Sequence, residues 1–219
     1  MVQPKDLFEM IKAAPLNGRR RLVAWVGPPA SGKSTLAQAL AEIDQHTQVV
    51  PMDGFHLDNS VLSDRGVLHR KGAPETFDVA GFLHLVERLR TEDAVIFPVF
   101  DRSRDLSIAG VGVILPSTET VIVEGNYLML DRPHWRDLAR LWDFSVRIDV
   151  PFQVLRQRLL QRWLDHDYSQ AEAAEKARSN DLPNAKLVHE TSLQCDVVIA
   201  GDQITIASSP APSTTKNSE

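Results

Sequence analysis

The sequence predicts a three-layer α/β/α fold built around a mainly parallel sheet. Short apolar segments suited to buried strands occur at residues 21–26, 120–124 and 144–150. Segments with helix-forming composition or helical spacing follow or separate them, at 35–42, 78–91 and 151–164. Strands that alternate with helices indicate a parallel sheet covered by helices on both faces. Ligands of such sheets bind at the carboxyl ends of the strands, so we expect the site there.

The remaining segments complete this alternation. We expect a short amphipathic helix at 4–14, a strand ending at 49–50, a long loop at 58–76, strands at 94–100 and 108–115, helices at 131–141 and 171–180 (the latter mobile), and a last hairpin at 196–200 and 203–207. From residue 208 on, Ser, Pro, Thr, Lys and Asn dominate, which is typical of disorder. The prediction is a single domain at 1–207 and a disordered tail at 208–219.

Composition narrows the class of protein. The 219 residues are 43% hydrophobic, which suffices for one full core. The net charge of −5 does not suggest a nucleic-acid partner. The single cysteine excludes an intrachain disulfide. No apolar run approaches a membrane span, and the first residues lack the apolar core of a signal peptide. We therefore expect a cytoplasmic protein with no membrane partner.

The most specific motif is GPPASGKS at residues 27–34, which matches the phosphate-binding pattern G-x-x-x-x-G-K-[ST]. A predicted strand precedes it and a predicted helix follows, the context that the motif requires. Backbone N–H groups of such a loop point at phosphate oxygens, Lys33 reaches the β- and γ-phosphates, and the Ser34 hydroxyl ligates the metal. The sequence thus predicts a site for ATP and Mg²⁺ formed by Gly27, Pro28, Ala30, Ser31, Gly32, Lys33, Ser34 and Thr35.

Two carboxylates follow predicted strands and should face the γ-phosphate. Asp53 comes after the second strand, and Glu124 ends the most apolar one. Phosphoryl transfer needs a group that accepts the proton of the acceptor hydroxyl, and a group that helps to hold the metal. The alternatives are a turn residue for Asp53, because Asp-Gly is a common turn pair, and a structural hydrogen bond for Glu124.

These motifs, together with three further segments, resemble a known family. GPPASGKS, MDGFH, RKGAPETFD, FPVFDRSRD and VIVEGNY are similar to segments of the uridine kinase, pantothenate kinase and phosphoribulokinase family of phosphate-loop (P-loop) kinases, over roughly residues 20 to 200. The resemblance is greatest to the bacterial branch that is described as fructose-transport-system or nucleoside kinases. It implies that Asp53 is the base on the acceptor hydroxyl and that Glu124 assists Mg²⁺.

The resemblance also indicates where the acceptor binds. Uridine kinases usually have Asp-Ser-Phe-Tyr where this chain has DGFH at 53–56, so the segment is more like that of the pantothenate kinases. The RKGAPETFD and FPVFDRSRD segments border the acceptor site in the family. The residues that we expect to contact the acceptor are His56, Arg70, Lys71, Asp101, Arg102 and Tyr127.

Kinases of this family close an arginine-bearing lid over the transferring phosphate, and the resemblance places it at approximately 156–184. Arg158 and Arg162 are four residues apart on one helical face and are the predicted catalytic arginines, with Lys33 and Asp53. The alternative is a solvated face with ion pairs, for example to Asp165. Leu155, Leu159 and Trp163 form a different stripe, which we expect in the core.

The predicted function is an ATP-dependent small-molecule kinase that transfers the γ-phosphate to a hydroxyl of a sugar, nucleoside or pantothenate-like acceptor. One alternative is a nucleotide-dependent regulatory ATPase or switch protein, although the chain has no N-K-x-D guanine-reading motif. Another is a nucleotide-binding scaffold without catalysis. The resemblance also allows for a homodimer.

Overall fold

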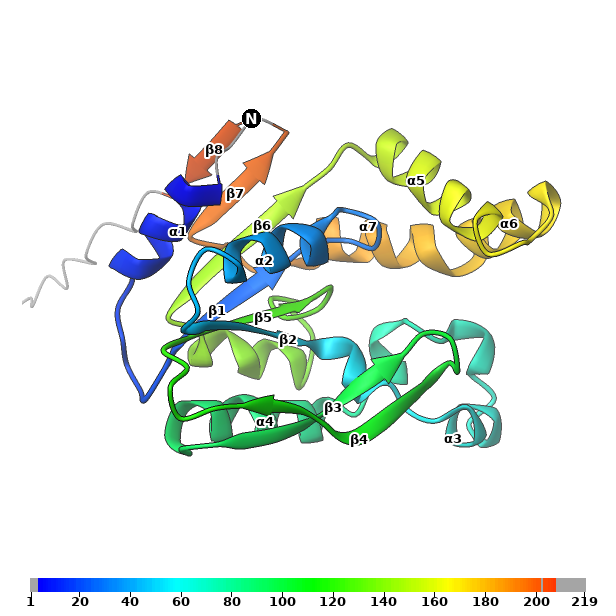
Figure 1. Ribbon diagram of the computed structural model, residues 1–219. Coiled ribbons are helices and arrows are strands. Elements are labelled where there is room, and N and C mark those ends of the chain that lie inside the picture. The colour runs from blue at the N-terminus through cyan, green and yellow to red at the C-terminus, as the bar shows by residue number, and fades with distance from the viewer. Residues whose placement is uncertain (1–3, 202, 208–219) are drawn as a thin grey trace, which may run out of the picture.

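A six-stranded sheet forms the centre of the molecule (Figure 1). The computed structural model describes residues 4–201 and 203–207, and the strand order is β2-β5-β1-β6-β7-β8. All neighbouring strands are parallel except β8, which pairs antiparallel with β7. The α/β fold with a mainly parallel sheet is confirmed. The strands are β1 (Arg21–Val26), β2 (Thr47–Pro51), β5 (Thr120–Gly125), β6 (Phe144–Asp149), β7 (Val197–Ala200) and β8 (Gln203–Ile206).

Helices cover both faces of this sheet (Figure 1). On one face lie α1 (Pro4–Ala13) and α2 (Lys33–Ala41). On the other lie α4 (Val79–Thr91), a 3₁₀ helix at Trp135–Leu141 and α7 (Leu182–Thr191). The helix predicted at 131–141 is therefore a shorter 3₁₀ helix. None of the helices in the described part of the chain is long and apolar enough to cross a membrane.

Alternate side chains of β1 pack against the helices on opposite faces of the sheet. Leu22, Ala24 and Val26 pack with α4 and α7, whereas Val23 and Trp25 pack with α1 and α2. All five are completely buried. A strand buried on both faces reads as a continuous apolar run, which is why this segment was recognisable in the sequence.

A separate antiparallel pair lies beside the main sheet (Figure 1). It consists of β3 (Val95–Asp101) and β4 (Leu106–Ile114), the strands predicted at 94–100 and 108–115. A Cβ atom at Gly112 would overlap the ring of Phe97, so glycine permits the close packing of the two strands. The turn that joins β3 to β4 points toward the carboxyl ends of the main strands.

The prediction of a long loop at 58–76 is wrong. The segment contains α3 (Asn59–Asp64) and two 3₁₀ turns, at Leu68–Arg70 and Pro74–Thr76. Asp58 caps α3, because its carboxylate accepts a 2.9 Å hydrogen bond from the backbone N–H of Ser60. Gly66 and Gly72 follow short helical turns and Pro74 begins one, and local backbone hydrogen bonds connect these turns.

The region between β6 and β7 is helical and extends away from the sheet (Figure 1). It contains α5 (Phe152–Leu164), α6 (Gln170–Lys176) and a π-helical turn at Ala177–Asp181 that leads directly into α7. A capping box between Ser169 and Glu172 starts α6. The predicted helices are present, and the tail predicted at 208–219 lies outside the described residues.

Candidate active site

The glycine loop joins β1 to α2 and is shaped for an anion. Gly32 has φ 88°, a left-handed conformation that favours glycine. A Cβ atom at Gly27 would lie 2.6 Å from Ser31 Oγ, so a side chain there would displace the loop. The indole of the buried Trp25 donates a 3.0 Å hydrogen bond to the carbonyl of Lys33, which anchors the start of α2. The N-terminus of α2 therefore faces the position of a bound phosphate.

Glu124 lies directly beside this loop, because β5 is the neighbour of β1 and Glu124 is in register with Trp25. Glu124 Oε2 is 4.0 Å from Lys33 Nζ. The Glu124 residue is only 6% exposed, and its Oε2 atom has no hydrogen-bond partner among residues 4–201 and 203–207. Burial raises the pKa of Glu124, against the opposing effects of Lys33 and Ser34. A buried carboxylate oxygen without a partner suits a site that receives a cation.

Asp53 approaches the loop from the other side of β5. It lies on the 3₁₀ helix Met52–Phe55 that follows β2, and β2 pairs with β5. The next residue, Gly54, packs so closely on the carbonyl of Pro98 that a Cβ atom would collide with it. Asp53 Oδ2 accepts a 2.9 Å hydrogen bond from Arg102 Nη2. The Asp-Gly pair thus fixes the carboxylate at the strand ends instead of forming a simple surface turn.

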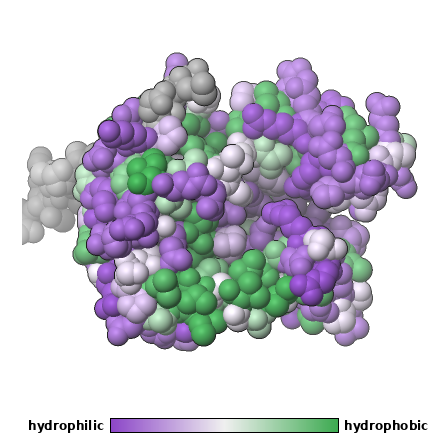
Figure 2. Space-filling model, viewed as in Figure 1, coloured by the Kyte–Doolittle hydropathy of each residue, from purple (hydrophilic) through white to green (hydrophobic). Residues whose placement is uncertain are grey.

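A cavity of about 910 Å³ connects the glycine loop with Asp53, and Glu124 is not among its lining residues. Figure 2 shows a hollow with largely hydrophilic rims between the two projecting lobes of the molecule. The cavity is lined by the glycine loop and α2 (Pro29, Ala30, Gly32, Lys33, Ser34, Thr35), by the opposite wall (Asp53, His56, Asn59, Lys71, Phe100, Arg102, Asp105) and by the α5–α7 region (Arg162, Trp163, His166, Tyr168, Lys176, Asn180).

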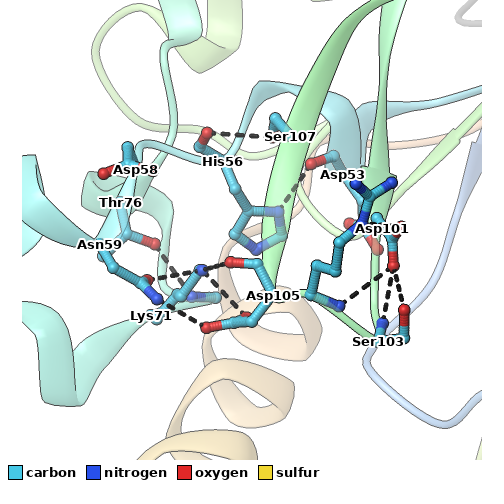
Figure 3. A network of polar contacts seen from close by, with 12 residues as sticks. Asp53, His56, Asp58, Asn59, Lys71, Thr76, Asp101, Ser103, Asp105 and Ser107 are labelled. Atoms are coloured by element: carbon cyan, nitrogen blue, oxygen red, sulfur yellow. Dashed lines mark hydrogen bonds and ion pairs between the residues drawn. The ribbon is translucent and has the colours of Figure 1, made fainter.

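His56 lies on the cavity wall opposite the glycine loop, close to Asp53 (Figure 3). Its ring lies between Phe77 and Phe100, with ring centroids 4.1 and 4.6 Å away. Burial lowers the pKa of His56, although Asp53 acts in the opposite direction. Its Nδ1–H donates a 2.8 Å hydrogen bond to the carbonyl of Asp53, because that oxygen can only accept. A neutral His56 therefore presents Nε2 as an acceptor.

Lys71 ties three segments of the same wall together (Figure 3). Its ammonium donates to Asn59 Oδ1 (2.7 Å), to the Asp105 carbonyl (2.7 Å) and to Asp105 Oδ1 (2.9 Å). It also lies 5.1 Å from the centroid of the Phe100 ring. An ammonium has three N–H donors, and these contacts use all of them. Lys71 lines the cavity but is committed to holding α3 against the β3–β4 turn.

Three predicted acceptor residues are not among the lining residues. Arg70 pairs with Glu75 at 3.0 Å. Asp101 accepts hydrogen bonds from Ser103 and Arg104 within the β3–β4 turn, and these bonds hold the pKa of Asp101 well below its usual range. Arg70 and Asp101, which do not line the cavity, are thus direct neighbours in the sequence of Lys71 and Arg102, which do.

Tyr127 is the third of these residues and is fully buried. Its ring packs edge-on against Phe77 and Trp135. Its hydroxyl donates a 2.6 Å hydrogen bond to the carbonyl of Gly72, and burial raises the pKa of the phenol. Tyr127 therefore supports the Lys71–Gly72 segment from behind.

The two predicted arginines of α5 make different contacts. Arg158 Nη1 donates to the carbonyls of Ala30 (3.2 Å) and Ser31 (3.4 Å) in the glycine loop. Arg162 Nη2 donates to Asp181 Oδ1 at 3.0 Å. The alternative partner for Arg162, Asp165, instead accepts a hydrogen bond from Gln161. Arg158 therefore lies against the glycine loop, whereas Arg162 lines the cavity beside Asp181.

The prediction that Trp163 belongs to the core is wrong. Leu155 and Leu159 are buried as expected, but Trp163 lines the cavity. Its indole N–H donates a 2.6 Å hydrogen bond to Asp181, and the Lys176 ammonium lies 4.7 Å from its ring centroid. Helical spacing alone could not distinguish Trp163 from the buried Leu155 and Leu159. The polar run Asp-His-Asp at 165–167 is the sequence signal that α5 extends beyond the core at that point.

Comparison with known proteins places this geometry in a family. No protein-family model matches the chain. The structure described as a "putative fructose transport system kinase" from Silicibacter sp. TM1040 is 45% identical, with a TM-score of 0.87 over 91% of this chain and 100% of that one. Protein YggC of Escherichia coli K12, which is named as uncharacterized, is 37% identical over 89% of this chain and 84% of its own.

A third relative carries a named kinase class. "Putative uridine kinase C227.14" of Schizosaccharomyces pombe is 31% identical over 83% of this chain and 83% of its own. The chain belongs to the uridine kinase, pantothenate kinase and phosphoribulokinase family of P-loop kinases. In this P-loop kinase the loop, Glu124 and Asp53 stand at the adjoining ends of β1, β5 and β2.

Proposed function

We propose that this protein is an ATP-dependent small-molecule kinase that transfers the γ-phosphate of ATP to a hydroxyl of a sugar, nucleoside or pantothenate-like acceptor. The observation that carries the proposal is that the Asp53 carboxylate opens into the same cavity as Lys33 and Ser34. A carboxylate facing a phosphate-binding loop across an open cavity provides a place for a second substrate.

Nucleotide binding uses the loop and the charged residues behind it. The backbone N–H groups after Gly27 and the ammonium of Lys33 bind the β- and γ-phosphates. The residues present fit Mg²⁺, because Glu124 Oε2 is a buried oxygen with no hydrogen-bond partner in the described part of the chain, and the Ser34 hydroxyl lies beside the same carboxylate. Ser34 would hold the ion directly, and Glu124 through its water shell. Bound Mg²⁺ neutralises negative charge on the phosphates.

Asp53 is the proposed base for transfer. The acceptor hydroxyl gives its proton to the Asp53 carboxylate while its oxygen forms a bond to the γ-phosphorus, and the bond from that phosphorus to the oxygen of ADP breaks. The products are ADP and a phosphate ester. His56 fixes the backbone of Asp53 through the 2.8 Å hydrogen bond of its Nδ1 and offers its other nitrogen to the acceptor.

Residues 156–184 form the proposed lid. Arg158 already contacts the carbonyls of Ala30 and Ser31, and Arg162 lines the cavity beside Asp181. A guanidinium has a fixed fork of donors that matches phosphate oxygens, which suits it to a transferring phosphoryl group. Asn180 Nδ2 donates a 2.7 Å hydrogen bond to the Lys71 carbonyl, so the lid also contacts the acceptor wall.

A screen of ADP release against sugars, nucleosides and vitamins, with Mg²⁺ and ATP, tests the proposal. Asp53→Ala provides the blank, and Asp64→Ala, which changes an exposed aspartate on α3, provides the matched control. The expected result is acceptor-dependent ADP release that only Asp53→Ala abolishes. ATP consumption that stays at background with every hydroxyl compound would reject the kinase assignment, and turnover that ignores the acceptor would favour a regulatory ATPase.

A further inference from the structure

Arg102 forms an exposed ion pair with the proposed base at the mouth of the cavity. Its Nη2 atom is 2.9 Å from Asp53 Oδ2. The Arg102 side chain is 68% exposed and that of Asp53 is 27% exposed. An ion pair this open to water contributes about 1 kcal/mol or less, so a bound molecule can replace it at little cost.

Arg102 differs from the other cation on the same wall. The three donors of Lys71 are all engaged by Asn59 and Asp105. Among the hydrogen bonds of the described residues, Arg102 makes one, to Asp53, and a guanidinium has five N–H donors. His56 adds no fixed charge, since burial favours its neutral form. Arg102 is therefore the cation of this wall that has donors to offer a ligand.

The pair creates a condition that an acceptor must meet. Arg102 occupies one of the two carboxylate oxygens of Asp53, so an acceptor hydroxyl that binds at Oδ2 must displace the guanidinium. A neutral acceptor would replace a charge-assisted hydrogen bond with a weaker neutral one and leave the guanidinium without a counterion. An acceptor with its own anionic group gives Arg102 a new counterion and leaves Asp53 free for the hydroxyl.

We propose that Arg102 binds an anionic group of the acceptor, so the acceptor is a hydroxylated carboxylate or a hydroxylated phosphate ester. Arg102 is thus a specificity-determining residue that moves from Asp53 to the acceptor on binding. This inference rests on the proposed kinase function and selects among its acceptors. It predicts that charge, more than the carbon skeleton, decides which hydroxyl compounds are phosphorylated.

Matched acceptor pairs test the inference in the full-length protein. Each pair has one charged and one neutral member: D-glycerate and glycerol, pantothenate and pantothenol, fructose 6-phosphate and fructose. ADP release gives kcat/KM for each compound with wild type, Arg102→Gln and Arg104→Gln. Arg104 is a matched control, because it is 62% exposed on the same turn, pairs with Asp101 at 2.8 Å and does not line the cavity.

The expected result is that the charged member of at least one pair exceeds its neutral partner by about 10-fold to 100-fold in kcat/KM, the range of a hydrogen bond to a charged group. Arg102→Gln reduces that ratio about 10-fold or more, mainly by raising the KM of the charged acceptor. Arg104→Gln leaves the ratio unchanged. Neutral members that equal their charged partners in every pair, or a charged preference that Arg102→Gln does not change, overturn the inference. Efficient phosphorylation of neutral compounds alone would reject it while leaving the kinase function intact.

A binding measurement decides the case in which no compound of the panel is phosphorylated. The protein is saturated with Mg²⁺ and a non-hydrolysable ATP analogue, so that the glycine loop is filled. Inorganic phosphate and, separately, D-glycerate are then titrated by calorimetry. Binding of at least one anion that is about 10-fold weaker in Arg102→Gln than in wild type supports the anion site. Equal or undetectable binding of both anions in the two proteins contradicts it.

Discussion

The Glu124 carboxylate lies 4.0 Å from the Lys33 ammonium, and the oxygen nearest to that ammonium has no hydrogen-bond partner within the residues that the structure describes. Glu124 lies on β5, and Lys33 begins α2 directly after the glycine loop that follows the adjoining parallel strand β1. A distance of 4.0 Å is too long for a hydrogen bond and leaves the oxygen open to a metal-bound water. This arrangement suits the Mg²⁺ ion that the proposed function assigns to the site.

The first prediction concerns the metal. Glu124→Gln keeps the size of the side chain but removes the charge, and we expect it to raise the Mg²⁺ concentration for half-maximal ADP release by about 10-fold to 100-fold. A Mg²⁺ titration at saturating ATP measures the effect. Glu119→Gln is the matched control, because Glu119 precedes the other end of the same strand and its side chain is 64% exposed. If Glu124→Gln has the same Mg²⁺ requirement as wild type, Glu124 does not help to bind the metal and has a structural role only.

A second prediction follows from the pKa of Glu124, which burial raises above its usual range. Between the unfolded-state pKa and the folded-state pKa of Glu124, the folded protein binds more protons than the unfolded protein. The free energy of unfolding therefore falls as the pH rises toward the folded-state pKa. We expect the unfolding temperature of Glu124→Gln to exceed that of wild type at pH 8 without nucleotide or Mg²⁺, and the difference to shrink at pH 4. A wild type that gains stability relative to the variant with rising pH would contradict the assigned direction.

The third prediction concerns the lid. Arg162→Lys keeps the positive charge but loses the fork of donors that spans Asp181 and the cavity. We expect kcat to fall about 10-fold or more, the scale of one charge-assisted hydrogen bond in the transition state, with little change in the KM for ATP. Gln161→Ala on the same helix is the control. Full kcat in Arg162→Lys would mean that the arginine only anchors Asp181.

A fourth prediction distinguishes a structural role of Tyr127 from direct contact with the substrate. Tyr127→Phe removes the donor to the Gly72 carbonyl, and we expect the free energy of unfolding to fall by about 1 to 3 kcal/mol. The KM of the acceptor should rise, because the Lys71–Gly72 segment loses its support, while kcat changes little. Urea unfolding and steady-state kinetics measure the two effects. Unchanged stability with a large loss of kcat would show instead that the hydroxyl contacts substrate.

The sheet and the phosphate-binding half of the site were predictable from the sequence for physical reasons. Strands buried on both faces contain apolar runs, such as residues 121–123 of the strand Thr120–Gly125, which are typical of a parallel sheet. The two glycines of the motif at 27–34 constrain the backbone of the loop, so the phosphate-binding loop can be identified from the sequence alone. Asp53 and Glu124 were predicted from their positions after strands, and the order β2-β5-β1 brings both beside the loop.

The acceptor half was less predictable, because short-range hydrogen bonds decide it. Arg102 lines the cavity while its neighbour Asp101 turns away to cap the β3–β4 turn. No periodicity distinguishes two adjacent residues of a turn. Trp163 was misjudged because its helical spacing continues the stripe of Leu155 and Leu159, whereas the helix extends past the edge of the core at that point. The Arg102–Asp53 pair joins residues 49 positions apart and required the structure.

The most direct test of the central claim is the fate of the γ-phosphate in wild type and Asp53→Asn. The reaction contains ATP, Mg²⁺ and an acceptor identified by the screen, and ³¹P NMR follows its products. We expect wild type to form ADP and a phosphate ester in equal amounts, and Asp53→Asn to form the ester about 10² times more slowly or worse with a similar acceptor KM. Inorganic phosphate as the main product at a rate independent of the acceptor, or an Asp53→Asn variant with wild-type kcat, would contradict the account.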